Sequence, residues 1–117
     1  MEIQAQSPAA DHPSRLASQH ELAGAYRANG QVEEAVGLLE EVVEIRSRSL
    51  VAGHPSRLAS RHNLATYLWT LGQHGRAHAM MNHVVKIRKT SLDEDHPSRQ
   101  SSEQWLAYFG PEIKQSF

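Results

Sequence analysis

The 117-residue chain contains no cysteine, which excludes disulfide bonds, thiolate catalysis and cysteine-based zinc sites. Its uninterrupted apolar runs are only a few residues long, far short of the ~20 residues that span a bilayer. The N-terminus has neither the basic start nor the apolar stretch of a signal peptide. The formal net charge is −1 at pH 7, whereas nucleic-acid-binding proteins usually carry a strongly basic face. We therefore expect a cytoplasmic protein that binds no nucleic acid, membrane, metal or cofactor.

What the chain does have is an internal repeat. The sequence His-Pro-Ser-Arg begins at His12, His54 and His96, so each copy starts 42 residues after the last. "HPSRLAS", "GQ" and "VV.IR" also recur at matching positions of the first two copies. The repeat predicts five segments, which are the tail of a preceding truncated repeat (1–11), repeat one (12–53), repeat two (54–95), the first helix of a truncated third repeat (96–109) and a C-terminal tail (110–117).

Each complete repeat predicts two helices. Proline is tolerated in the first turn of a helix, where Pro13 falls, and Gly30 suits the left-handed conformation that follows a helix end. The second helix is expected over about 32–50. Apolar residues recur at helical spacing in these segments. The positions expected to face the core are Leu16, Ala17, His20, Ala23 and either Leu22 or Tyr26, then Ala35, Leu38, Leu39, Val42, Ile45 and Arg46, and in repeat two Ala77, Met80, Met81, Val84, Val85 and Ile87.

Short connections make consecutive helices antiparallel, so each repeat is expected to be a helical hairpin. One hairpin cannot bury both of its apolar faces, and stacked hairpins share a continuous core. The sequence therefore predicts an all-α fold of about five helices, stacked as a short right-handed α-solenoid.

The repeated polar residues have structural interpretations. His12, His54 and His96 precede a helix start, where the helix dipole disfavours a positive charge, so we expect neutral capping residues. The three arginines of the repeat, Arg15, Arg57 and Arg99, are expected to pair with acidic groups of the preceding helix. His74 and His78 are four residues apart, as metal ligands on one helix face can be, but no acidic residue lies among them. A surface histidine pair is the preferred interpretation, and we do not expect an enzyme.

Several residues carry a resemblance to a known family. The packing positions Leu22, Ala23, Tyr26, Gly30, Ala35, Leu39 and Val42 resemble those of a tetratricopeptide repeat. The 42-residue period, the "HP" start and "GQ..EA" are similar to the kinesin-light-chain type of this repeat. Such arrays also occur at the C-terminus of fungal NACHT or NB-ARC signalling proteins. The resemblance covers about residues 2–109, and no phosphate-binding loop of an ATPase is present.

The resemblance implies binding of a peptide or partner protein in a concave groove lined by the first helix of each repeat. Trp, Tyr and Arg are common anchors at such interfaces, and Asn and Gln can pair with backbone amides. The residues carried over to the groove are His20, Glu21, Gly24, Arg27, His62, Asn63, Thr66, Trp69, Gln104, Trp105 and Tyr108.

Two alternatives to peptide binding stay open. Because both ends fall within a repeat, the exposed faces could stack head to tail and form a homo-oligomer. The chain could also be a remnant of a larger NACHT or NB-ARC-type signalling protein.

Overall fold

The computed structural model of the protein describes residues 12–111, which form five α-helices. These are α1 (Pro13–Ala28), α2 (Val32–Ser49), α3 (Pro55–Leu71), α4 (His74–Ser91) and α5 (Pro97–Phe109). The predicted tail of a preceding repeat, residues 1–11, and residues 112–117 lie outside the described residues. No helix in the described part is both long enough and apolar enough to cross a membrane.

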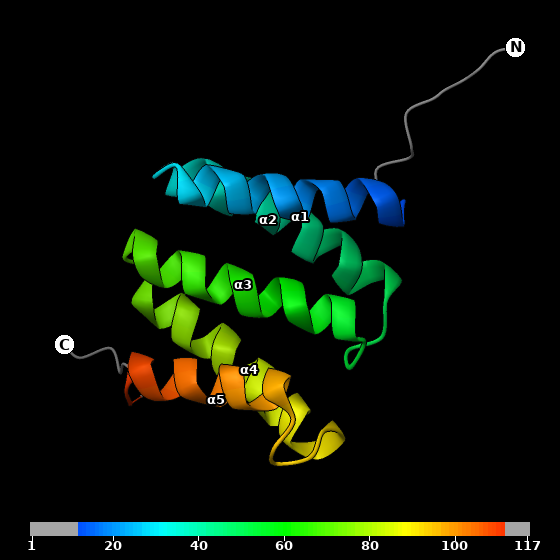
Figure 1. The fold of residues 1–117 in the computed structure, drawn as a ribbon, viewed down its shortest axis with the longest axis vertical. Helices are drawn as coiled ribbons and strands as arrows, with labels where there is room; N and C mark the ends of the chain where they lie inside the picture. Colours follow the sequence, from blue (N-terminus) through cyan, green and yellow to red (C-terminus); the bar gives the residue numbers. More distant parts are fainter. Residues whose placement is uncertain (1–11, 112–117) are drawn as a thin grey trace, which may run out of the picture.

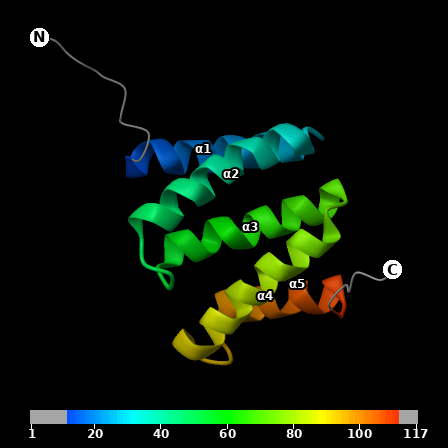
Figure 2. The ribbon, with the colours of Figure 1, turned by 180° about the vertical axis from the view of Figure 1, so that it is seen from behind.

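The helices form two layers, as an α-solenoid requires. Figure 1 shows α1, α3 and α5 side by side in the front layer, and Figure 2 shows α2 and α4 on the opposite side. Each helix packs on the next one along the chain, and α3 also contacts α5 across the first-helix layer. The all-α prediction is confirmed.

The local signals in the sequence account for the helix ends. At each first helix, the unprotonated Nδ1 of the histidine accepts a hydrogen bond from the backbone N–H of the serine two residues later, at 3.0–3.1 Å. The proline occupies the first turn, where it removes an N–H that has no partner within the helix. Gly30 and Gly72 adopt φ values of +82° and +97° in the turns between paired helices. The predicted capping role of His12, His54 and His96 is therefore confirmed.

The core lies between the layers. Its fully buried large side chains are Leu39, Val42, Leu64, Leu68, Met81 and Val84. Either Leu22 or Tyr26 was expected to face the core. Tyr26 packs against it, whereas Leu22 is 47 % exposed. Ala17 was also expected to face the core, but its side chain is exposed.

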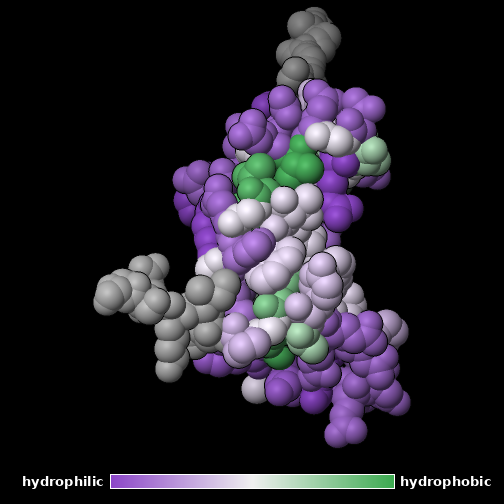
Figure 3. All heavy atoms as spheres, turned by 90° about the vertical axis from the view of Figure 1, so that its left-hand side faces the viewer, coloured by the Kyte–Doolittle hydropathy of each residue, from purple (hydrophilic) through white to green (hydrophobic). Residues whose placement is uncertain are grey.

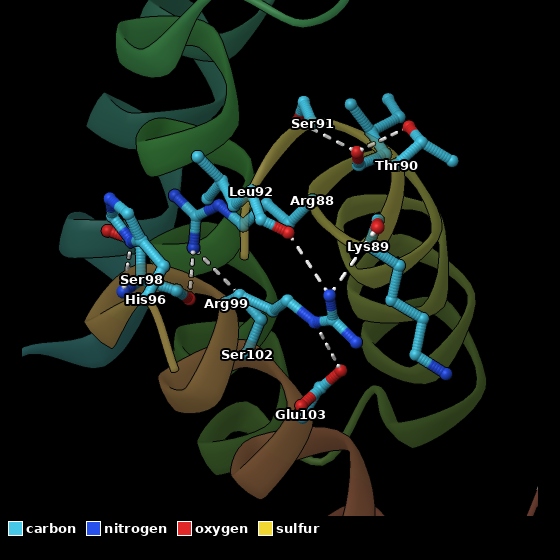
Figure 4. Close-up of polar contacts among 11 residues, drawn as sticks. Arg88, Lys89, Thr90, Ser91, Leu92, His96, Ser98, Arg99, Ser102 and Glu103 are labelled. Atoms are coloured by element: carbon cyan, nitrogen blue, oxygen red, sulfur yellow. Dashed lines mark hydrogen bonds and ion pairs between the residues drawn. The ribbon is translucent and has the colours of Figure 1, made fainter. Parts of the chain in front are cut away.

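Arginine and carbonyl groups join each hairpin to the next. Arg57 Nη1 donates to the carbonyls of Ser47 and Leu50, at 3.2 and 2.8 Å. Arg99 makes the corresponding bonds at the end of α4, to Lys89 at 3.5 Å and to Leu92 at 3.1 Å (Figure 4). The expectation of acidic partners on the preceding helix is wrong for both arginines, because the last carbonyls of a helix have no partner within it and accept from the guanidinium.

A second arginine, on the preceding helix, also bonds across the connection between one hairpin and the next. Arg88, in the last turn of α4, donates to the carbonyl of Ser98 at 3.0 Å and to the hydroxyl of Ser102 at 2.8 Å (Figure 4). Arg46 donates to the carbonyl of Ser56 in the corresponding place, at 3.1 Å. The His-Pro-Ser-Arg motif therefore starts a helix and also anchors it to the hairpin before.

Candidate functional site

The first helices bring the predicted groove residues onto one layer of the molecule. Because α1, α3 and α5 lie side by side, residues spaced by one repeat become neighbours in space (Figure 1). Most of these residues fall into two groups. One group surrounds an open hollow near the C-terminal ends of the first helices, and the other forms hydrogen bonds between helices.

The hollow has a volume of about 530 Å³ and is open to solvent. We call it the aromatic hollow and define it by its lining residues, which are Arg27, Trp69, Thr70, Gln104, Trp105 and Tyr108. All but Thr70 were predicted from the sequence. Thr70 lies one residue beyond the predicted Trp69 and four beyond Thr66, so the repeat pattern of the groove did not include it.

The aromatic rings are held in fixed arrangements. Trp69 is stacked between Phe109, with ring centroids 4.2 Å apart, and His74, with centroids 4.0 Å apart. Trp105 meets the ring of Tyr108 edge to face at 5.7 Å. Both faces of Trp69 are therefore covered, and Tyr108 is the most accessible anchor because 68 % of its surface is exposed.

The charge at the hollow comes from a single side chain. Arg27 is exposed, and its guanidinium lies over the ring of Tyr67 at 5.1 Å from the ring centroid. This cation–π contact orients the guanidinium without neutralising its charge. Glu21 is exposed one helical turn and a half earlier on α1 and does not line the hollow.

The surface around these helix ends is the least polar part seen from this side. Figure 3 faces the ends of the helices where α1, α3 and α5 finish, and a band of near-white and hydrophobic residues runs along the long axis between strongly hydrophilic flanks. Aromatic and apolar groups that remain accessible in this way are typical of interaction surfaces.

The second group of predicted residues joins α1, α3 and α5. The side-chain amide of Asn63 donates to Nε2 of His20 at 3.0 Å, across the α1–α3 contact. Ser102 accepts a hydrogen bond from Arg88, so its own hydroxyl proton is available for Nδ1 of His62, 2.8 Å away. The amide nitrogen of Asn63 can only donate, so Nε2 of His20 is the acceptor in the first contact and carries no proton.

Burial supports this assignment of neutral histidines. Burial, followed by the positive charge of Arg88, lowers the pKa of His62 to about 4. The pKa of His20 is also lowered, by burial and then by Arg46, against the smaller opposing effect of Glu21. Both residues are neutral near pH 7 and serve as links between helices.

Thr66 and Gly24 are less available than the sequence indicated. Thr66 is 7 % exposed, and its hydroxyl donates to the carbonyl of Asn63 at 2.8 Å. Gly24 is half-buried, and a Cβ at that position would lie 3.8 Å from the hydroxyl of Tyr67. Of the predicted groove, the part that is free to receive a partner is therefore the aromatic hollow.

The histidines of α4 do not form the expected surface pair. His78 is 7 % exposed, and its Nε2 donates to the carbonyl of Gly110 at 3.0 Å, whereas His74 is exposed and stacks on Trp69. The expectation failed for His78 because α5 covers that side of α4. Within residues 12–111, no group of three or more histidine, aspartate or glutamate side chains is arranged to hold a metal ion.

Comparison with known proteins agrees with the geometry. The model of the tetratricopeptide repeat family matches residues 14–90. A crystal structure of nearly identical TPR-like repeats of the kinesin-light-chain type from Podosopora anserina is 51 % identical, with a TM-score of 0.86, over 88 % of this chain and 49 % of that one. A crystal structure of a point variant of those repeats is 54 % identical, with a TM-score of 0.83, over 85 % of this chain and 47 % of that one. No curated protein matches the chain.

The chain belongs to the tetratricopeptide repeat family, and its repeats are similar to those of the kinesin-light-chain type. It spans about half the length of the solved structures that it matches. Repeats of this family generally mediate protein–protein interaction.

Proposed function

We propose that the chain is a non-catalytic interaction module that binds a peptide or partner protein along the face formed by α1, α3 and α5. The observation that carries this proposal is the aromatic hollow, where residues from three helices surround one open space. These residues come from three successive repeats, so only the stacked array assembles the site.

The chemistry of the lining favours recognition over catalysis. The hollow combines aromatic surface with the amide of Gln104, the hydroxyl of Thr70 and the guanidinium of Arg27, all of which can bond a peptide backbone or a carboxylate. Its lining includes no histidine, aspartate or glutamate to act as a general acid or base. Tryptophan, tyrosine and arginine are the residues that most often dominate binding energy at protein interfaces.

The test is selection of binding peptides from a displayed random library on the wild-type protein, followed by affinity measurement on variants. We expect Tyr108→Ala to weaken the selected peptides about tenfold or more, because an accessible aromatic anchor is lost. Gln104→Ala, also exposed, should give a smaller loss. Neither variant should change the melting temperature appreciably, since surface substitutions usually alter stability by less than about 0.5 kcal/mol.

The matched control is Val51→Ala, which truncates an apolar side chain that is 74 % exposed and does not line the hollow. Its peptide affinity should equal that of the wild type. If the selected peptides bind Tyr108→Ala and Gln104→Ala as tightly as they bind Val51→Ala, the aromatic hollow is not the binding site. Trp69→Ala is a poorer test, because Trp69 is stacked between two rings and its loss would disturb the fold.

A further inference from the structure

The lining of the aromatic hollow offers more hydrogen-bond donors than acceptors. The guanidinium of Arg27 and the indole N–H groups of Trp69 and Trp105 are donors that cannot accept a hydrogen bond. The amide of Gln104 both donates and accepts, and no carboxylate is among the described residues of the lining. The chemistry of the hollow therefore suits a ligand that brings many acceptors and few donors.

These donors are free to meet a ligand. Trp69 and Trp105 are half-buried, and neither indole N–H bonds an acceptor within residues 12–111. In the same range, the buried side-chain nitrogen and oxygen atoms that lack a partner belong to residues outside the hollow, so both indole N–H groups reach solvent. Thr70 differs, because its hydroxyl donates to the carbonyl of Thr66 at 3.2 Å and is left as an acceptor. The excess of donors is therefore accessible from solvent.

The aromatic rings of the hollow form walls that face different directions. The ring planes of Trp105 and Tyr108 are 88° apart, with centroids separated by 5.7 Å. Trp69 has both faces covered, by Phe109 and His74, so it presents the edge of its ring to the hollow. These contacts orient the rings before any ligand arrives, which lowers the conformational entropy that is lost on binding.

Proline is the residue whose chemistry matches this lining. An ordinary residue brings one backbone N–H for each C=O, whereas proline brings a C=O and no N–H. Proline-rich segments adopt the extended polyproline II helix, which has no internal hydrogen bonds and leaves its carbonyls free. Aromatic-lined grooves recognise such segments because the preformed helix loses little entropy on binding.

We propose that the preferred ligand of the aromatic hollow is a proline-rich segment in the polyproline II conformation, an inference that rests on the peptide-binding function proposed above. The indole N–H groups of Trp69 and Trp105 and the amide of Gln104 donate to carbonyls of the segment. Proline rings pack on Tyr108, which is 68 % exposed. Arg27 gives the hollow a positive charge, so segments with lysine or arginine beside the prolines are disfavoured.

The first measurement is a titration with an oligoproline of about eight residues with blocked termini, followed by the tryptophan fluorescence of the protein. The two tryptophans of the chain both line the hollow, and oligoproline contains no tryptophan. We expect saturable binding that is at least about tenfold tighter than that of an alternating glycine–serine peptide of equal length. Because oligoproline is uncharged, its affinity should be nearly equal in about 0.05 M and about 0.5 M sodium chloride.

Two variants test the donors directly. Trp105→Phe keeps an aromatic ring and removes an indole N–H, and Gln104→Glu keeps the size of an exposed side chain and removes its amide donor. Each should weaken oligoproline binding about three- to tenfold, the range expected for the loss of one hydrogen bond. Tyr108→Ala, which removes a surface for the proline rings, should weaken it about tenfold or more. Gln104 and Tyr108 are exposed, so their variants stay folded and decide the test if Trp105→Phe lowers the melting temperature.

The matched control is again Val51→Ala, a change outside the hollow, which should bind oligoproline like the wild type. The proposal is overturned if oligoproline binds no better than the glycine–serine peptide, or if Tyr108→Ala and Gln104→Glu bind it as tightly as Val51→Ala. The peptides selected from the random library separate this failure from failure of the proposed function. Enrichment of proline among them supports the proline-rich ligand. Peptides that depend on Tyr108 but are enriched in acidic residues instead of proline overturn it and leave the proposed function intact.

Discussion

The first hairpin, α1–α2, and the second, α3–α4, have matching sequences but very different burial. Leu22 and Leu64 occupy the same repeat position, yet Leu22 is 47 % exposed and Leu64 is 1 % exposed. The reason is that α3 packs on both α2 and α4 and also contacts α5, whereas α1 packs chiefly on α2. The comparison teaches that a repeat residue becomes a core residue through its neighbours, and that the second hairpin holds the stack together.

The largest expected effect follows directly from this comparison. Leu64→Ala should lower the free energy of unfolding by about 2–5 kcal/mol, because it leaves a cavity between packed helices. Leu22→Ala makes the same chemical change at the exposed counterpart and should cost less than about 1 kcal/mol. Urea denaturation followed by far-ultraviolet circular dichroism measures both. Equal losses would contradict the view that neighbouring helices decide the role of this position.

A second, intermediate effect concerns His62, which links α3 to α5. Its pKa is about 4 in the folded protein, lowered by burial and then by Arg88, against about 6.5 in the unfolded chain. Above pH 6.5 both states are neutral and stability is complete. As the pH falls from 6.5 towards 4, only the unfolded state takes up a proton at this residue, so the free energy of unfolding decreases. We expect a loss of about 1–3 kcal/mol, after allowance for solvent screening.

The control for this titration is His62→Gln, which keeps an acceptor for the hydroxyl of Ser102 but cannot be protonated. Its unfolding free energy should fall less between pH 6.5 and 4 than that of the wild type. The pKa of His20 is also lowered, and His20 is still present in this variant. Part of the decrease in unfolding free energy at low pH should therefore remain. An unchanged pH dependence in His62→Gln would show that His62 is not the responsible group.

The smallest effect compares the same helix cap in the two hairpins. His54→Ala should destabilise the protein by about 1 kcal/mol, because α3 loses the side-chain acceptor at its N-terminus. His12→Ala removes the identical bond from α1 but should cost about 0.5 kcal/mol, since fraying there stays local. Asparagine accepts the same kind of bond, so His54→Asn should restore most of the loss. Thermal unfolding of the four proteins checks the order, and a larger cost at His12 would reverse our interpretation.

The aromatic hollow also arises from small differences between repeats. Where α1 carries Ala25, α3 carries Tyr67, and the ring of Tyr67 receives the guanidinium of Arg27 from the neighbouring helix. Where α1 carries Arg27, α3 carries Trp69, so the cation and the aromatic ring line the same space. The differences between the repeats therefore provide the side chains that line the hollow. The similarity of the repeats provides the stacked helices that position those side chains.

The sequence by itself determined the helices and their ends. Capping histidines, first-turn prolines and turn glycines act within a few residues, so their effect can be judged locally. The helix over about 32–50 and the structure's α2, Val32–Ser49, agree to within a residue. The period also predicted that Arg27, Trp69, Gln104, Trp105 and Tyr108 lie on one layer of the molecule, because the first helices of stacked repeats lie side by side.

Only the tertiary structure decided which polar side chains find partners inside the molecule. His62 and Asn63 bond side chains of other helices, and Arg57 and Arg99 bond backbone carbonyls of the preceding helix or its end. His78 is covered by α5 and bonds the carbonyl of Gly110. A backbone carbonyl as partner cannot be inferred from side-chain types, and a contact between residues 40 positions apart depends on how the hairpins stack. The spacing of residues sets the face on which each lies, and the packing of neighbouring helices then determines whether that face is core, link or open surface.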